Sequence, residues 1–270
     1  MSWAIEVIGL QKSYRNHTVL KNIEFRVEKG EIFALLGVNG AGKTTALECI
    51  EGVRRYDAGS VRVYGRMGIQ FQTSTLPAYI RPMEAVKLFA KWNGVKPDVG
   101  MLSSLGFNEF GKKQYEQLST GQKRRLYLAL ALVGDPDIIF LDEPTAGIDV
   151  EGRLALHSNI RELKRAGKTA ILASHDMAEI EALCDRVAIL SGGRIVFCGT
   201  VAELTRAVGR KYHVHVETDV GVWEVETENI TDALLKMLGE VRQKNLEILD
   251  IKVDRGTLEQ HFVEMVRRDM

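Results

Sequence analysis

Hydrophobic and polar positions alternate over short stretches at the beginning of the chain, a pattern typical of strands. Three such stretches are separated by turn-forming residues such as Lys29-Gly30, and they cover 4–10, 22–27 and 31–36. The third stretch leads into a glycine-rich loop, which leads into a helical pattern over 43–51. Another strand is expected at 60–65. The pattern predicts a β-rich beginning in which a strand, a loop and a helix follow directly on one another.

The pattern changes at residue 81, where three helical segments each end at a glycine: 82–94, 98–106 and 120–134. We therefore expect a helical insertion over about 81–133. Apolar strands and helices then alternate, with strands at 138–143, 169–174, 186–190 and 194–199 and helices at 151–167 and 177–184. This alternation predicts an α/β fold with a mainly parallel sheet covered on both faces.

A third pattern begins near residue 211. Alternating positions predict a hairpin, and a helix, a strand and a second helix follow it, at 212–218, 222–227, 230–241, 246–253 and 257–268. His213 and His215 lie two apart on one strand, but without a third ligand nearby ordinary surface histidines are favoured over a metal site. We predict a main domain over 1–210 and a small α+β appendage over 211–270.

Composition limits the possible functions. Lys+Arg and Asp+Glu both number 36, which argues against a protein that binds nucleic acid through bulk positive charge, so no nucleic-acid partner is expected. The cysteines Cys49, Cys184 and Cys198 form no CxxC motif and favour reduced thiols in the cytosol. The longest apolar run, 126–133, is much shorter than a spanning helix. Any membrane role is therefore expected to come through a partner.

The glycine-rich loop matches the pattern GxxxxGK[ST], and its residues are Gly37, Val38, Asn39, Gly40, Ala41, Gly42, Lys43 and Thr44, followed by Thr45. Glycines let the backbone N–H groups approach phosphates closely, and the following helix adds its positive end. Lys43 can bind the β- and γ-phosphates, and the Thr44 hydroxyl can coordinate Mg²⁺. Because a strand precedes the loop and a helix follows it, the motif predicts a nucleoside triphosphatase that uses Mg²⁺.

Two carboxylates, Asp142 and Glu143, end the apolar strand that begins at residue 138. A central parallel strand carries its C-terminal end to the edge of the sheet where ligands bind. There Asp142 is suited to holding Mg²⁺, directly or through water, and Glu143 to activating the attacking water as a general base.

The segment Leu118-Ser119-Thr120-Gly121-Gln122 resembles the LSGGQ signature of ABC ATPases. With the phosphate loop and the acidic strand end, the resemblance covers roughly residues 4–205. It implies a P-loop NTPase of ABC type, with an N-terminal antiparallel β subdomain and a helical insertion. Two residues depart from the frequent pattern: Val38 stands where proline is frequent, and Thr120 replaces the first glycine of the signature.

The resemblance also implies roles for individual residues. Tyr14 resembles the aromatic residue that stacks on adenine. Gln72 resembles the glutamine that contacts Mg²⁺ and the attacking water, and His175 resembles the switch histidine near the γ-phosphate. ATP bound by one subunit would also meet the signature and the D-loop of a second subunit, with contacts from Ser119, Gly121, Gln122 and Asp149.

These features together imply the ATP-hydrolysing subunit of an ABC transporter. Its partners would be a second nucleotide-binding subunit (a copy or a near relative) and a separate permease, which would hold it at the cytoplasmic face of the cell membrane. The ending 257–262 resembles the TLEDVF-type tail of drug-resistance and antibiotic-export subunits, which favours export. Soluble ABC ATPases of DNA repair or translation remain the alternative, although they usually carry two nucleotide domains, a long coiled coil or zinc modules. A nonhydrolysing module is disfavoured because Lys43, Asp142, Glu143 and His175 are all present.

Overall fold

The chain divides into two compact units, 1–198 and 199–270, which are described separately. The structure, a computed structural model, describes residues 2–70, 75–208 and 212–255. The domain boundary predicted at residue 210 stays a prediction, because a compact unit need not fold independently. No helix among the described residues combines the length and the apolar composition that crossing a bilayer requires.

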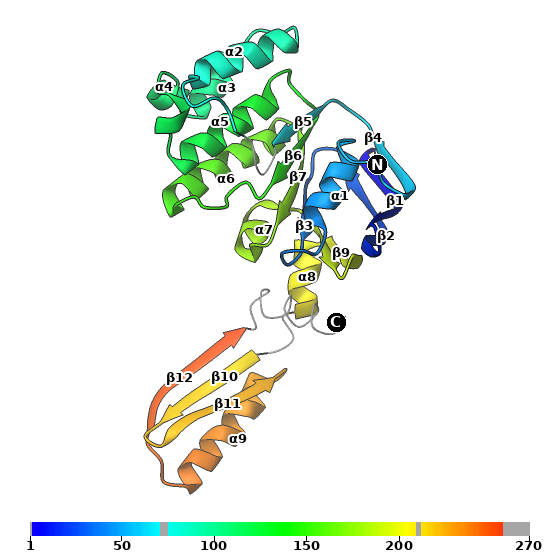
Figure 1. The fold of residues 1–270 in the computed structure, drawn as a ribbon. Helices are drawn as coiled ribbons and strands as arrows, with labels where there is room; N and C mark the ends of the chain where they lie inside the picture. Colours follow the sequence, from blue (N-terminus) through cyan, green and yellow to red (C-terminus); the bar gives the residue numbers. More distant parts are fainter. Residues whose placement is uncertain (1, 71–74, 209–211, 256–270) are drawn as a thin grey trace. The chain divides into compact units, whose positions relative to one another are not determined.

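A mainly parallel sheet forms the centre of the first unit (Figure 1). Its strands in the described residues are, in sheet order, β5 (Met67–Gln70), β6 (Ile138–Asp142), β7 (Thr169–Ser174), β3 (Ile32–Leu36), β8 (Arg186–Ser191) and β9 (Arg194–Thr200). The pairs from β5 through β8 are all parallel. Every residue of β3, β6 and β7 is buried, as expected for strands covered on both faces. The predicted α/β fold is confirmed.

Two layers cover this sheet. On one face lie α1 (Lys43–Ile50) and an antiparallel sheet of β2 (His17–Glu28), β1 (Trp3–Tyr14) and β4 (Ala58–Val63). On the other face α5 (Thr120–Leu132), α6 (Val150–Arg165) and α7 (Met177–Leu183) contact β5, β7 and β3 (Figure 1). The segment predicted as helical insertion contains α2 (Pro82–Trp92), α3 (Val99–Ser104), α4 (Phe107–Phe110), the 3₁₀ turn η1 (Tyr115–Gln117) and α5.

The second unit contains the predicted hairpin. Its elements in the described residues are α8 (Val201–Val208), β10 (Tyr212–Thr218), β11 (Gly221–Thr227), α9 (Ile230–Gln243) and β12 (Ile248–Arg255). The three strands pair antiparallel in the order β11-β10-β12. Val214 and Val216 pack against Met237 and Val241 of α9, so the unit has its own small core. The helix predicted at 257–268 lies outside the described residues.

Candidate functional site

The glycine-rich loop joins β3 to α1, and the geometry at Gly42 and Gly37 shows why glycine stands there. Gly42 has a φ of 104°, and a Cβ there would lie 3.0 Å from Leu20 Cδ2. A Cβ on Gly37 would lie 2.7 Å from the carbonyl oxygen of Leu190. The loop backbone therefore packs directly on β2 and β8, which fixes its course beneath the space where a ligand can bind.

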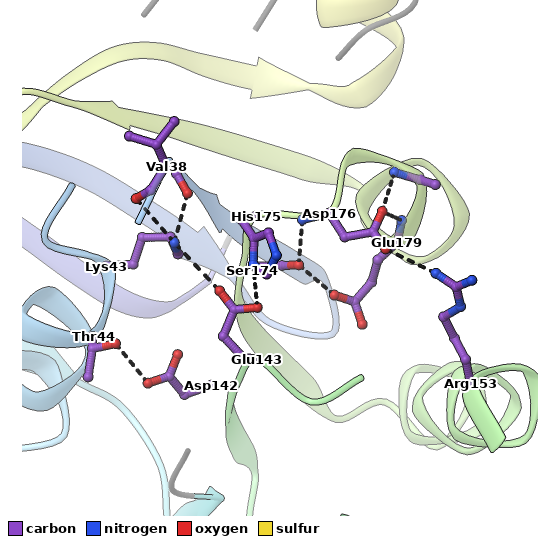
Figure 2. Close-up of polar contacts among 12 residues, drawn as sticks. Val38, Lys43, Thr44, Asp142, Glu143, Arg153, Ser174, His175, Asp176 and Glu179 are labelled. Atoms are coloured by element: carbon purple, nitrogen blue, oxygen red, sulfur yellow. Dashed lines mark hydrogen bonds and ion pairs between the residues drawn. The ribbon is translucent and has the colours of Figure 1, made fainter. Parts of the chain in front are cut away.

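Lys43, the first residue of α1, is buried inside this loop. Its Nζ donates a hydrogen bond to the carbonyl oxygen of Gly37 at 2.7 Å and a longer one, 3.4 Å, to that of Val38 (Figure 2). The same Nζ lies 3.5 Å from Glu143 Oε1, and both side chains are less than one-tenth exposed. The loop and the acidic strand end, predicted separately from the sequence, therefore meet at this ion pair.

Asp142, the last residue of β6, lies beside Thr44, the second residue of α1. Thr44 Oγ1 donates to Asp142 Oδ2 at 3.0 Å (Figure 2). Burial raises the pKa of Asp142, and the Thr44 hydrogen bond partly opposes this. The second carboxylate oxygen, Oδ1, is buried and has no hydrogen-bond partner among the described residues. A hydroxyl and a carboxylate with a free oxygen are the ligands that Mg²⁺ prefers, so these residues fit a magnesium ion.

Glu143 connects the loop to the predicted switch histidine. Its φ is 48°, a left-handed conformation unusual outside glycine, and its backbone N–H donates to the carbonyl oxygen of Ala173 in β7 at 2.9 Å. Glu143 Oε2 lies 2.8 Å from Nδ1 of His175, which is about half exposed (Figure 2). Its carboxylate thus lies between a buried ammonium group and an accessible imidazole.

A cavity of about 400 Å³ lies over the loop. Its lining residues are Val19, Asn39, Gly40, Gly42, Lys43, Thr44, Thr45 and Glu143. The lining thus combines residues of the amide-rich loop with one cation, Lys43, and one carboxylate, Glu143. Val19 was not predicted from the sequence, because an apolar residue near the start of a strand carries no signal for a ligand.

The residues predicted to bind nucleotide from a second subunit begin helices. Ser119 caps α5: its Oγ accepts from the N–H of Gln122, and Gln122 Oε1 accepts from the N–H of Ser119, both at 3.2 Å. Gly121 lies in the same helical turn. Asp149 caps α6 by accepting from the N–H of Gly152 at 2.8 Å. These side chains do not line the cavity over the loop of their own subunit.

Tyr14, the residue predicted to stack on adenine, lies apart from this cavity. Tyr14 ends β1 and is partly exposed, with the cations of Lys12 and Arg54 each 5.4 Å from its ring centre. It does not line the cavity over the loop. Gln72 lies outside the described residues.

Comparisons with known proteins identify the family of this chain. Residues 20–146 match the sequence profile of the ABC transporter family. The chain is 29% identical to the linearmycin resistance ATP-binding protein LnrL of Bacillus subtilis (strain 168), over 98% of this chain and 99% of that protein. It is 36% identical to the Nod factor export ATP-binding protein I of Paraburkholderia xenovorans (strain LB400), over 74% of this chain and 72% of that protein.

The fold is also found in solved structures. An ATP-binding subunit of an ABC transporter superposes with a TM-score of 0.69 at 26% identity, covering 76% of this chain and 93% of that one. The sequence profile, the two relatives and the fold of the solved structure therefore all point to the same family. The chain belongs to the family of ABC transporter ATP-binding proteins.

Proposed function

We propose that this protein is the ATP-binding and ATP-hydrolysing subunit of an ABC exporter. Proteins of its family hydrolyse ATP. The observation that carries the proposal is the position of Glu143: its carboxylate lines the cavity over the phosphate loop, between Lys43 and His175.

ATP binds with its phosphates over residues 37–45. The loop amides and the N-terminal end of α1 offer hydrogen-bond donors to the negatively charged phosphates. Lys43 now donates to the loop carbonyls of Gly37 and Val38. These bonds hold the ammonium group in the cavity wall, and it exchanges them for β- and γ-phosphate oxygens when ATP binds.

Thr44 and Asp142 hold the magnesium ion that accompanies ATP. The support is the free, buried oxygen of Asp142 next to the Thr44 hydroxyl. The ion supplies charge neutralisation on the phosphates when it is bound. Burial raises the pKa of Asp142, which disfavours its ionised form without a cation, so Asp142 is expected to bind the ion more weakly as the pH falls.

Glu143 acts as the general base for the attacking water. A carboxylate that accepts a proton from water must lie within hydrogen-bond reach of it, and Glu143 faces the cavity that holds the phosphates. His175 stabilises and orients this carboxylate from the exposed side, where Nδ1 lies 2.8 Å from Oε2. Gln72 is assigned, by resemblance only, to the same water and to the magnesium ion.

A second nucleotide-binding subunit completes the site. Ser119, Gly121, Gln122 and Asp149 lie at the N-terminal ends of α5 and α6 rather than in the cavity of their own subunit, as expected for residues that reach a nucleotide bound by a partner. Each ATP is then sandwiched between two subunits, while Tyr14 stacks on the adenine ring. Hydrolysis removes the group that bridges the subunits and lets them separate.

Export is the proposed direction of transport, through a separate permease at the cytoplasmic face of the membrane. The support comes from relatives: one is named for resistance to linearmycin and one for Nod factor export. The opening and closing of two ATP-binding subunits would then drive the permease, which selects the substrate.

Titration of ATP into the Lys43→Ala variant tests the nucleotide assignment. Removing the buried ammonium group should weaken ATP binding by about 10- to 100-fold, because a hydrogen bond to a charged group is lost. Lys87→Ala, at an exposed position of α2, is the matched control and should bind ATP normally. Unchanged ATP affinity in Lys43→Ala, measured by calorimetry, would contradict the assignment of the loop.

A further inference from the structure

One side of α6 carries a row of polar residues spaced four apart: Asp149 at its cap, then Arg153 and His157. Two of them reach the beginning of α7. Arg153 Nη1 donates to Asp176 Oδ2 at 3.1 Å, and His157 Nε2 lies 3.7 Å from Glu179 Oε1. The two contacts join α6 to the helix that follows His175 directly.

Glu179 also holds the residue that precedes His175. Its Oε2 accepts a hydrogen bond of 2.6 Å from Ser174 Oγ, and Ser174 is fully buried at the end of β7 (Figure 2). Ser174 Oγ in turn accepts from the N–H of Asp176 at 3.1 Å. The neighbours of His175 on both sides are thus fixed through one buried carboxylate.

The contact between Glu179 and His157 is incomplete. Both side chains are buried, with Glu179 1% and His157 6% exposed. Neither Glu179 Oε1 nor His157 Nε2 has a hydrogen-bond partner in the part of the chain that the structure describes. Two buried polar atoms that face each other without a hydrogen bond are unfavourable. A displacement of α6 by less than 1 Å would bring them within hydrogen-bond distance.

We propose that Glu179 and His157 are positioning residues for His175. Glu179 fixes Ser174 and thereby the backbone from which His175 reaches Glu143, while His157 couples Glu179 to α6 and its Asp149 end. A movement of α6 that brings His157 into hydrogen-bond distance of Glu179 would thus change the position of His175 through Glu179 and Ser174. The proposal rests on the proposed function, because it assumes that His175 acts on Glu143.

Steady-state ATP hydrolysis by the full-length protein tests this role. Glu179→Met removes both acceptors at similar length, so kcat should fall about 10- to 100-fold through misplacement of His175. KM and ATP affinity should stay within about twofold, because Glu179 does not line the cavity over the loop. Glu179→Gln keeps an oxygen for Ser174 and should restore most of kcat. The matched control is Glu181→Gln, at an exposed position of the same helix.

His157→Phe and Ser174→Ala test the two ends of the contact with smaller changes, and circular dichroism checks that each variant is folded. Both should lower kcat without changing ATP affinity. Wild-type kcat in folded Glu179→Met and Ser174→Ala would overturn the proposal. So would a KM that rises as far as kcat falls, which would indicate a general loss of structure.

A double-mutant cycle separates this proposal from the proposed function. If Glu179 acts through His175, Glu179→Met should have no further effect on kcat in a His175→Ala background. Additive effects would overturn the positioning role while leaving His175 in the site. Unchanged kcat in His175→Ala alone would instead overturn the proposed role of His175, and the positioning role with it.

Discussion

Glu51 is a carboxyl group buried at the C-terminal end of α1, and its ionisation should weaken the fold. It is 9% exposed. Burial, with added repulsion from Asp142 and Glu48, raises the pKa of Glu51 from its ordinary 4.5 to about 7. Replacement by glutamine keeps the shape and removes the charge.

The raised pKa of Glu51 makes the free energy of unfolding depend on pH. The folded state holds the proton of Glu51 more tightly than the unfolded state does, so the free energy of unfolding decreases as the pH rises from 4.5 to about 7. Above about pH 7 the ionised carboxyl group costs the folded state about 3 kcal/mol. The cost at pH 5 is under about 1 kcal/mol, because the folded state then keeps the proton.

Urea denaturation at pH 5 and at pH 8 checks this prediction. Glu51→Gln should raise the free energy of unfolding at pH 8 by about 3 kcal/mol and change it by less than about 1 kcal/mol at pH 5. Glu181→Gln, at an exposed site, is the matched control for the substitution itself. A stability difference between Glu51→Gln and the wild type that is equal at the two pH values would refute the reasoning.

Two further predictions concern the phosphate loop and the second unit. In Gly42→Ala the new Cβ would lie 3.0 Å from Leu20 Cδ2, on a residue whose φ is 104°. The resulting backbone strain in the loop should lower ATP affinity about tenfold in a folded protein. Normal ATP affinity in calorimetry would contradict this prediction. A chain truncated after Gly209 should still bind Mg-ATP, because the residues that line the cavity all precede Gly209, while its dimerisation or transporter-coupled activity should change. Loss of Mg-ATP binding in a truncated chain that circular dichroism shows to be folded would contradict this prediction.

The local sequence was sufficient to predict those parts of the site that lie within one short segment. The strand, the loop and α1 were predicted together because the glycine pattern requires that context. Ser119 caps α5, and Gln122 of the same short segment completes the capping box. Such features depend on neighbouring residues only, so they can be identified before the tertiary structure is known.

Contacts between distant segments were not predictable in this way. Glu179 lies 22 residues after His157, and nothing in either helix alone indicates that their side chains meet in the interior. Burial of Glu51 is likewise decided by the packing of α1, since a glutamate at a helix end is ordinarily exposed. The nearness of Glu143 and His175 likewise depends on the pairing of β6 with β7, and neither segment alone indicates it.

Single-turnover hydrolysis of ATP by Glu143→Gln tests the central claim most directly. Glutamine keeps the size of the side chain that lies between Lys43 and His175 but cannot accept the proton from water. The rate should fall by about 10²- to 10⁴-fold. ATP affinity should be retained, and ATP-bound dimers should accumulate on a sizing column. Near-normal turnover would show that Glu143 is not the base and would contradict the account.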